Sequence, residues 1–292
     1  MTTLSRAFAL SSVAVVLFSS ACSGSGAGSS FISGTDASGG AGGTDGAGSA
    51  GGAAGGGPIL GAGSGGRDGG GGAVNDAGCV GPNLTGVIRD FHMGNRAGGH
   101  PDFETFTGTG ETGIVLPLLG SDGKPVYDDT RPHQFTTTRA NFDQWYRDTA
   151  GVNASIPFRI DPQPVGNGVY TYDAQAFFPI DGRGFGNEGE NHNFSFTYEL
   201  HTEFAYSGGE SFTFSGDDDL WTFINGHLAI DLGGVHEAQT ATVRLDDRAQ
   251  ELGLVKGNTY DLAVFQAERH TTESHFRVDT TIRFTNCTPI LR

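Results

Sequence analysis

Basic residues and cysteines are scarce in this sequence. The 292 residues include 17 Lys and Arg against 33 Asp and Glu, and only three Cys. Two of the basic and four of the acidic residues precede Cys79, so the remainder of the chain carries a formal charge of −14. This excess of negative charge argues against nucleic acid or anionic lipid as a partner, and it suits cations and neutral sugars.

Long apolar runs are also missing, and the one at the N-terminus is too short to cross a membrane. Arg6 precedes the apolar run Ala7–Phe18, which predicts a secretory signal peptide over residues 1–21. Cys22 follows directly, at the place where lipoprotein processing attaches lipid, although Ser19 stands where such sites usually have Leu. We expect an exported, lipid-anchored outer-membrane or cell-surface protein, and the alternative is a freely secreted one.

Residues 22–78 are poor in apolar side chains. Glycine fills 24 of the 56 positions from 23 to 78, and no apolar period is present from which a core could form. We therefore expect a flexible tether.

The composition changes at Cys79, and residues 79–292 are long enough for one sizeable domain. Cys79 and Cys287 lie at the two ends of this region, so in an exported protein they predict a disulfide that joins the termini. Zinc is a poor alternative because neither cysteine has another nearby.

Alternating apolar residues dominate the domain and predict an all-β fold, an antiparallel β-sandwich or barrel with one short inserted helix. The helix is expected around Phe142, Trp145 and Tyr146, ending at Gly151. We expect the side chains of Trp145 and Tyr146 to pack against the sheet. The alternative is that they form an aromatic surface on which a sugar ring stacks. The expected strands lie in 84–91, 194–204, 240–245, 260–266 and 276–284.

The strongest local signal is Asn225-Gly226 between two alternating apolar segments, which predicts a two-residue hairpin turn. Folding the chain there sets Phe223 opposite Leu228 and Trp221 opposite Ile230, with all four on one face.

Three adjacent carboxylates, Asp217, Asp218 and Asp219, precede this hairpin. Neighbouring carboxylates repel by about 1 kcal/mol at 4 Å in water, and by more where solvent is displaced. One interpretation is that the three aspartates lie in a loop that is exposed to solvent. If the loop packs onto the sheet, a hard cation such as calcium is the natural compensation.

The stretch Gly216–His236 resembles the signature of the fibro-slime domain, a branch of the PA14-like β-sandwich domains that include carbohydrate-binding adhesins. Gln266 and His275 depart from the family pattern, where His and Asn are expected. Further blocks that resemble the family, in the family's order, are 88–91, 99–104, 142–148, 151–153, 177–182, 184–189, 192–197 and 267–272.

The resemblance implies a calcium site. In PA14-like adhesins an Asp-Asp pair joined by a cis peptide binds calcium, which in turn binds sugar hydroxyls. Alignment on the Asn225-Gly226 turn gives this role to Asp217 and Asp218, with Glu268 from the following polar loop as a further ligand. The remaining residues expected to bind the ligand are Asp219, Arg269, His270, His236 and Trp221.

The sequence gives little support to a zinc site or to a catalytic site. His192, His236 and His270 are widely separated and lack the i, i+4 spacing of a helical zinc motif. No nucleophile elbow and no phosphate-binding loop is present, and pairs of acids are too common here to indicate a glycosidase. We expect a calcium-dependent binder of carbohydrate or extracellular matrix. The alternatives are a structural matrix or slime component and, less favoured, a polysaccharide-degrading enzyme or its accessory module.

Overall fold

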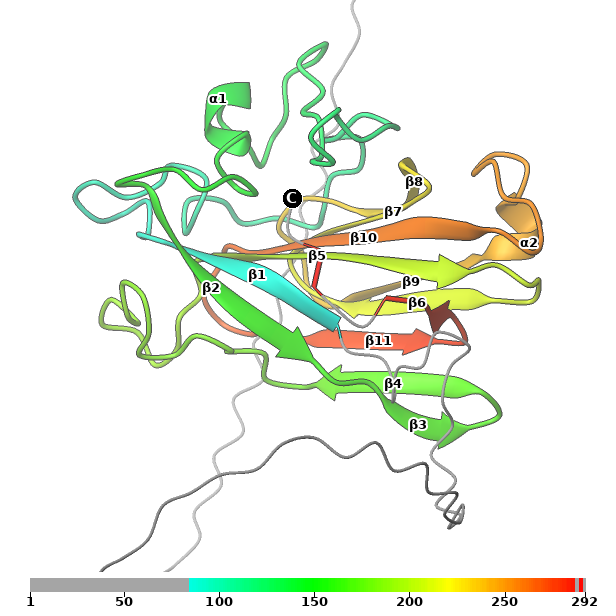
Figure 1. Cartoon of the computed structure of the whole chain (residues 1–292). Helices are drawn as coiled ribbons and strands as arrows, with labels where there is room; N and C mark the ends of the chain where they lie inside the picture. The colour runs from blue at the N-terminus through cyan, green and yellow to red at the C-terminus, as the bar shows by residue number, and fades with distance from the viewer. Residues whose placement is uncertain (1–83, 287–288, 291–292) are drawn as a thin grey trace, which may run out of the picture. The chain divides into compact units, whose positions relative to one another are not determined.

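The computed structural model describes residues 84–286 and 289–290, which form two stacked antiparallel sheets (Figure 1). The predicted disulfide (Cys79, Cys287), the lipid site Cys22, the signal peptide and the tether all lie outside these residues. No helix in the described part of the chain is long and apolar enough to span a membrane.

The larger sheet has the order β2-β1-β5-β10-β7-β8, with β12 also paired to β5. Its strands are β1 (Leu84–Phe91), β2 (Asn153–Ile160), β5 (Phe196–Ala205), β7 (Asp219–Ile224), β8 (His227–Leu232), β10 (Thr259–Glu268) and β12 (Arg283–Phe284).

The smaller sheet has the order β3-β4-β11-β6-β9. Its strands are β3 (Gln163–Gly166), β4 (Val169–Ala174), β6 (Ser211–Gly216), β9 (Gln239–Arg244) and β11 (Phe276–Thr280), and a four-residue helix, α2 (Leu245–Arg248), follows β9. The predicted all-β class is therefore confirmed.

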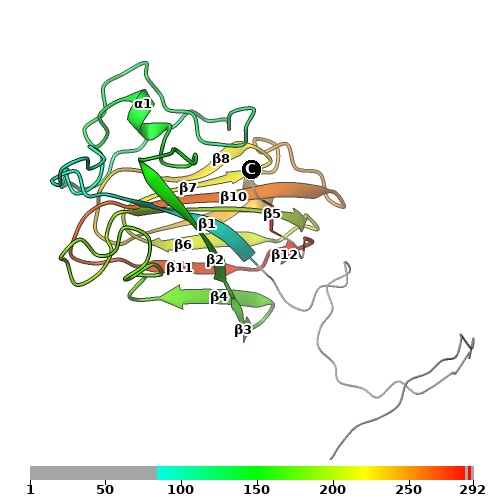
Figure 2. The ribbon, with the colours of Figure 1, turned by 60° about the vertical axis from the view of Figure 1, so that its left-hand side comes forward.

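Two apolar cores share the larger sheet. Inward-facing residues such as Leu220, Ile224 and Val264 pack between the sheets with Phe214 and Phe276. The opposite face of the same strands carries a second set, Trp221, Phe223, Ala263, Phe265 and Ala267, which packs against residues of the segment 92–152. In both views this segment, with α1 (Arg139–Phe142), covers the outer face of the sheet (Figures 1 and 2). Every residue of β7 is consequently buried.

The hairpin at Asn225-Gly226 forms as predicted, but its register is only partly right. Phe223 pairs with Leu228, whereas Thr222 rather than Trp221 pairs with Ile230. A bulge places Ala229 between these pairs, and one extra residue moves the side chains beyond it to the other face. Ile230 thus joins the core between the sheets, while Trp221 joins the outer core.

The predicted helix is shorter than its apolar spacing indicated. α1 ends at Phe142, and Trp145 and Tyr146 lie in the turns that follow it. Both are fully buried, in the outer core, so they pack on the sheet and do not form a sugar platform. The predicted strand over 276–284 is also broken after Thr280, because β12 crosses to pair with β5 in the other sheet.

Candidate functional site

The site lies where the chain crosses twice between the two sheets. Asp217 and Asp218 link β6 of the smaller sheet to β7 of the larger one, and residues 269–275 lead from β10 back to β11. The two crossings are held together because Gly216 pairs with Phe276. The peptide bond between Asp217 and Asp218 is cis, as the resemblance implied.

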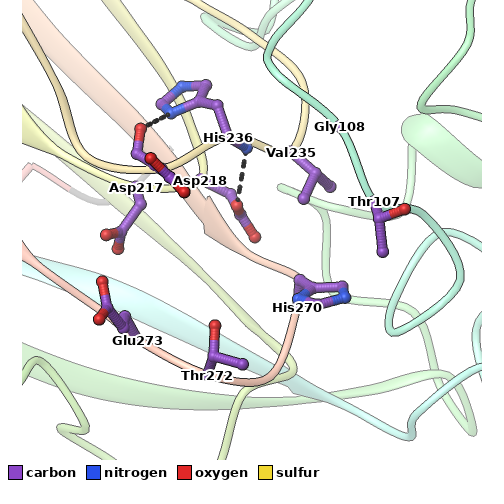
Figure 3. A pocket seen from close by; sticks show the side chains of 10 residues that line it. Thr107, Gly108, Asp217, Asp218, Val235, His236, His270, Thr272 and Glu273 are labelled. Atoms are coloured by element: carbon purple, nitrogen blue, oxygen red, sulfur yellow. Dashed lines mark hydrogen bonds between the residues drawn. The ribbon is translucent and has the colours of Figure 1, made fainter. Parts of the chain in front are cut away.

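A cavity of about 180 Å³ opens between these crossings (Figure 3). Four parts of the chain line it: the covering segment, the Asp217-Asp218 link, the β8–β9 connection and the β10–β11 loop. The lining residues are Thr107, Gly108, Asp217, Asp218, Val235, His236, Glu237, His270, Thr272 and Glu273.

Main-chain donors orient both aspartates of the link. The carboxylate of Asp218 accepts a hydrogen bond from the main-chain N–H of His236 and another from that of Arg269, each at 3.1 Å. The carboxylate of Asp217 accepts one from the main-chain N–H of His275 at 2.7 Å, and its other oxygen lies 2.7 Å from the His275 ring nitrogen Nδ1. Each carboxylate oxygen has two lone pairs, so acceptor capacity remains for a further ligand.

Glu268 ends β10, is fully buried and is not among the residues that line the cavity. Its Oε1 accepts a hydrogen bond from the main-chain N–H of His270 at 3.4 Å, while its Oε2 makes no hydrogen bond of regular geometry within the described residues, although the Ser274 side chain lies close enough to lower the pKa of Glu268. Burial raises the pKa of Glu268 well above its usual range, and the nearby carboxylate of Asp218 raises it further. A buried oxygen without a hydrogen bond of regular geometry is rare in folded proteins and calls for an explanation.

Burial also disfavours the ionised form of Asp218. Burial raises the pKa of Asp218 to about 8, even though the cation of Arg269 acts in the opposite direction. The positive charge of Arg269 is paired mainly with Asp219, to which its Nε donates a hydrogen bond at 2.6 Å. Asp217, Asp218 and Glu268 therefore form an acidic group in which the described cations do not stabilise the ionised forms of Asp218 and Glu268 enough to keep their pKa values in the usual range.

Arg269 and Asp219 hold the covering segment to the sheet. Both side chains are fully buried, and Arg269 also donates from Nη1 to the main-chain oxygens of Asp102 and Phe135, at 2.9 and 2.8 Å. The guanidinium carbon lies 4.6 Å from the ring centre of Trp145. Neither Arg269 nor Asp219 lines the cavity, so the structure gives them a positioning role instead of the expected ligand contact.

The other expected ligand residues divide in two. Trp221 is fully buried in the outer core, where its Nε1 donates to Asp231 at 3.0 Å, so it cannot contact a ligand in the cavity. His270 and His236 do line the cavity. The ring nitrogens of His236 lie 2.8 Å from the main-chain oxygen of Glu237 and 3.2 Å from that of Leu232.

Sequence reasoning missed the opposite wall of the cavity. Thr107 and Gly108 come from the covering segment, and only its packing on the sheet brings them to the site. No local pattern marks them. Glu273 carried a weak signal, as an acidic residue within the polar loop after β10.

Comparison with known proteins shows which protein family this chain matches. Residues 165–290 match the PA14 domain model. Protein psiD of Dictyostelium discoideum is 40% identical over 198 residues, and protein psiR of the same organism is 38% identical over 217 residues. These matches cover 63% and 68% of this chain, but only 38% of psiD and 21% of psiR.

Solved structures of low identity also match. One is the PA14 sugar-binding domain from an RTX adhesin, with 10% identity, 71% of this chain and 94% of that chain covered, and a TM-score of 0.29. Another is the A domain of epithelial adhesin 6 from Candida glabrata in complex with Galβ1-3GlcNAc, with 16% identity, 71% and 82% covered, and a TM-score of 0.30.

The chain thus carries a PA14 domain. It is homologous to the psi proteins, which are members of the fibro-slime family, so the resemblance stated from the sequence is confirmed.

Proposed function

We propose that this protein is a non-enzymatic, exported binder of carbohydrate or extracellular matrix, and that its site is centred on one calcium ion. Membership of the PA14 class supports the sugar-binding part of the proposal. The observation that carries the calcium part is the buried acidic group Asp217, Asp218 and Glu268, in which Oε2 of Glu268 makes no hydrogen bond of regular geometry to any described residue.

The three carboxylates offer the oxygen ligands that a hard cation prefers, and their oxygens, which do not all lie within 4.8 Å of one another, would move closer when the ion binds. Calcium takes six to eight oxygen ligands and accepts irregular geometry, which suits carboxylates from two separate crossings of the chain. Asp217, Asp218 and Glu268 would hold the ion, and Arg269 and Asp219 would keep the crossings in place. When bound, the ion supplies positive charge and open coordination positions for sugar hydroxyls. His270 lines the same cavity and offers a hydrogen bond to a sugar, whereas both ring nitrogens of His236 already lie against main-chain oxygens, those of Glu237 and Leu232.

A glycan array tests the proposal, with chelator-stripped protein probed in millimolar calcium and again in excess chelator. We expect glycan signals that require calcium and that Asp218→Asn abolishes. Asp247→Asn is the matched control, because it removes the same charge from an exposed aspartate on α2, outside the cavity lining. Glycan signals of equal strength in chelator would contradict the calcium-centred site. Calcium binding without any glycan signal would instead favour the structural matrix component.

A further inference from the structure

We propose that Asp217, Glu273 and His275 form a second cation site, for a divalent transition-metal ion such as zinc, beside the proposed calcium site. One ligand atom from each of the three residues lies within 4.8 Å of the other two. Atoms bound to one zinc ion at about 2.0–2.2 Å are separated by about 3–4 Å, so small side-chain adjustments bring these three into range.

Two of the three ligands are fixed by the backbone. Asp217 directly follows β6 and His275 directly precedes β11, at the point where Gly216 pairs with Phe276. A Cβ on Gly216 would lie 2.3 Å from the main-chain oxygen of His275, so glycine permits this close approach. The aspartate and the imidazole are therefore held side by side whether or not an ion is present.

Glu273 supplies the third ligand from the same loop, two residues before His275. Its side chain and that of Asp217 face the same gap at the edge of the cavity (Figure 3). Within the described part of the chain Glu273 has no hydrogen bond or ion pair, so a metal ion would displace no partner of Glu273, and if it binds Nδ1 of His275 it would replace the 2.7 Å contact of this atom with Asp217.

The chemistry of the donors separates this site from the calcium site. One imidazole with two carboxylates is a set that zinc and its first-row neighbours accept, whereas calcium prefers oxygen ligands alone. Asp217 belongs to both groups, and its two carboxylate oxygens allow it to contribute one to each ion. The inference depends on His275 and Glu273, which the calcium proposal does not use.

Isothermal titration of zinc into chelator-stripped full-length protein tests the inference. We expect the wild-type protein to bind one zinc ion per chain, and His275→Asn to lower zinc affinity at least tenfold more than it lowers calcium affinity. His192→Asn is the matched control, because His192 is a partly exposed histidine that also bonds a carboxylate, Asp181, at 2.6 Å. This control should leave zinc affinity unchanged.

Glu273→Gln provides a second variant at an exposed position, where misfolding is not expected. It should weaken zinc binding at least fivefold with an unchanged melting temperature in chelator. Equal zinc affinity in wild type and His275→Asn, or equal losses in His275→Asn and His192→Asn, would overturn the inference. These outcomes are separate from a failure of the calcium site, which would appear as the absence of a calcium effect in the wild type and would leave the zinc titration intact.

Discussion

Single residues set the spacing of the site, and Gly216 is the clearest case. Its α-hydrogen faces the main-chain oxygen of His275, with Asp217 next in the chain. Asp90 shows a different constraint at the same scale. It is fully buried, and its carboxylate accepts hydrogen bonds from the main-chain N–H of Phe185 at 2.5 Å and from the side chain of Asn193 at 2.8 Å.

Gly216→Ala should weaken calcium binding at least tenfold, because the new methyl group forces β6 away from residue 275 and displaces Asp217. The accompanying loss of stability should be about 1–3 kcal/mol. Calcium titration and urea unfolding measure the two effects. Gly168→Ala is the control, since it adds backbone strain at φ +74 without any close contact. It should lower stability by about 1 kcal/mol and leave calcium affinity intact. Equal affinity in both variants would contradict this role of Gly216.

Asp90 predicts a measurable pH dependence of stability. Burial raises the pKa of Asp90 to about 6, so its contribution to stability is fully present below about pH 4 and is lost as the pH rises through 6. The full effect is at most about 3 kcal/mol. In paired urea titrations, Asp90→Asn should therefore gain stability relative to wild type between pH 4 and pH 7. A difference between the two proteins that stays constant over this range would show that Asp90 does not titrate as expected.

At the scale of elements, a buried group of charges fastens the covering segment to the larger sheet. Glu199 on β5 binds Lys124 of the segment, and it also accepts hydrogen bonds from Arg89 at 2.6 Å and pairs with His201 at 2.7 Å. Lys124 and Glu199 are both almost fully buried. Together with Arg269, this group positions the segment that carries Thr107 and Gly108 to the cavity.

Lys124→Met should destabilise the protein by about 2–3 kcal/mol, because Glu199 loses one of its partners in a buried position. Urea unfolding gives the magnitude, and hydrogen exchange should show faster opening across residues 92–152. Lys256→Met removes an exposed lysine paired with Asp246, so the same measurements should show a loss below about 1 kcal/mol. If both variants behave alike, the buried group does not hold the segment.

The sequence predicted well those elements whose signals are local. The Asn225-Gly226 turn and the strand over 84–91 formed as expected, because turn chemistry and alternation act over a few residues. The bulge at Ala229 and the early end of α1 were not predictable in this way, since neither is marked by a signal in the neighbouring residues. The position of Asp217 and Asp218 in a cavity came from family resemblance. The burial of Trp221 and Arg269 required the fold.

At the scale of the whole molecule, the two ends of the domain meet at one edge of β5. β1 pairs with residues 196–199 of β5, and β12 pairs with Phe204 and Ala205. Since β10 occupies the other edge of β5 throughout, β1 and β12 lie on the same side. The described chain therefore begins and ends close together.

The Cys79–Cys287 disulfide stays a prediction, since both cysteines lie outside the described residues; in the sequence Cys79 precedes β1 by five residues and Cys287 follows β12 by three. Peptide mapping of the exported protein under non-reducing conditions should recover the linked pair. Reduction should lower stability by up to about 5 kcal/mol, the estimate for closing so long a loop. Recovery of both cysteines as free thiols would contradict this prediction.

Thermal unfolding of chelator-stripped protein with added calcium tests the central claim most directly. An ion that binds only the folded state should stabilise it by about 2.7 kcal/mol at a hundredfold excess over Kd. We expect millimolar calcium to raise the melting temperature of the wild type and of Asp247→Asn, and to have no effect on Asp218→Asn. A wild-type melting temperature that calcium leaves unchanged, or equal shifts in both variants, would contradict a calcium ion held by Asp217, Asp218 and Glu268.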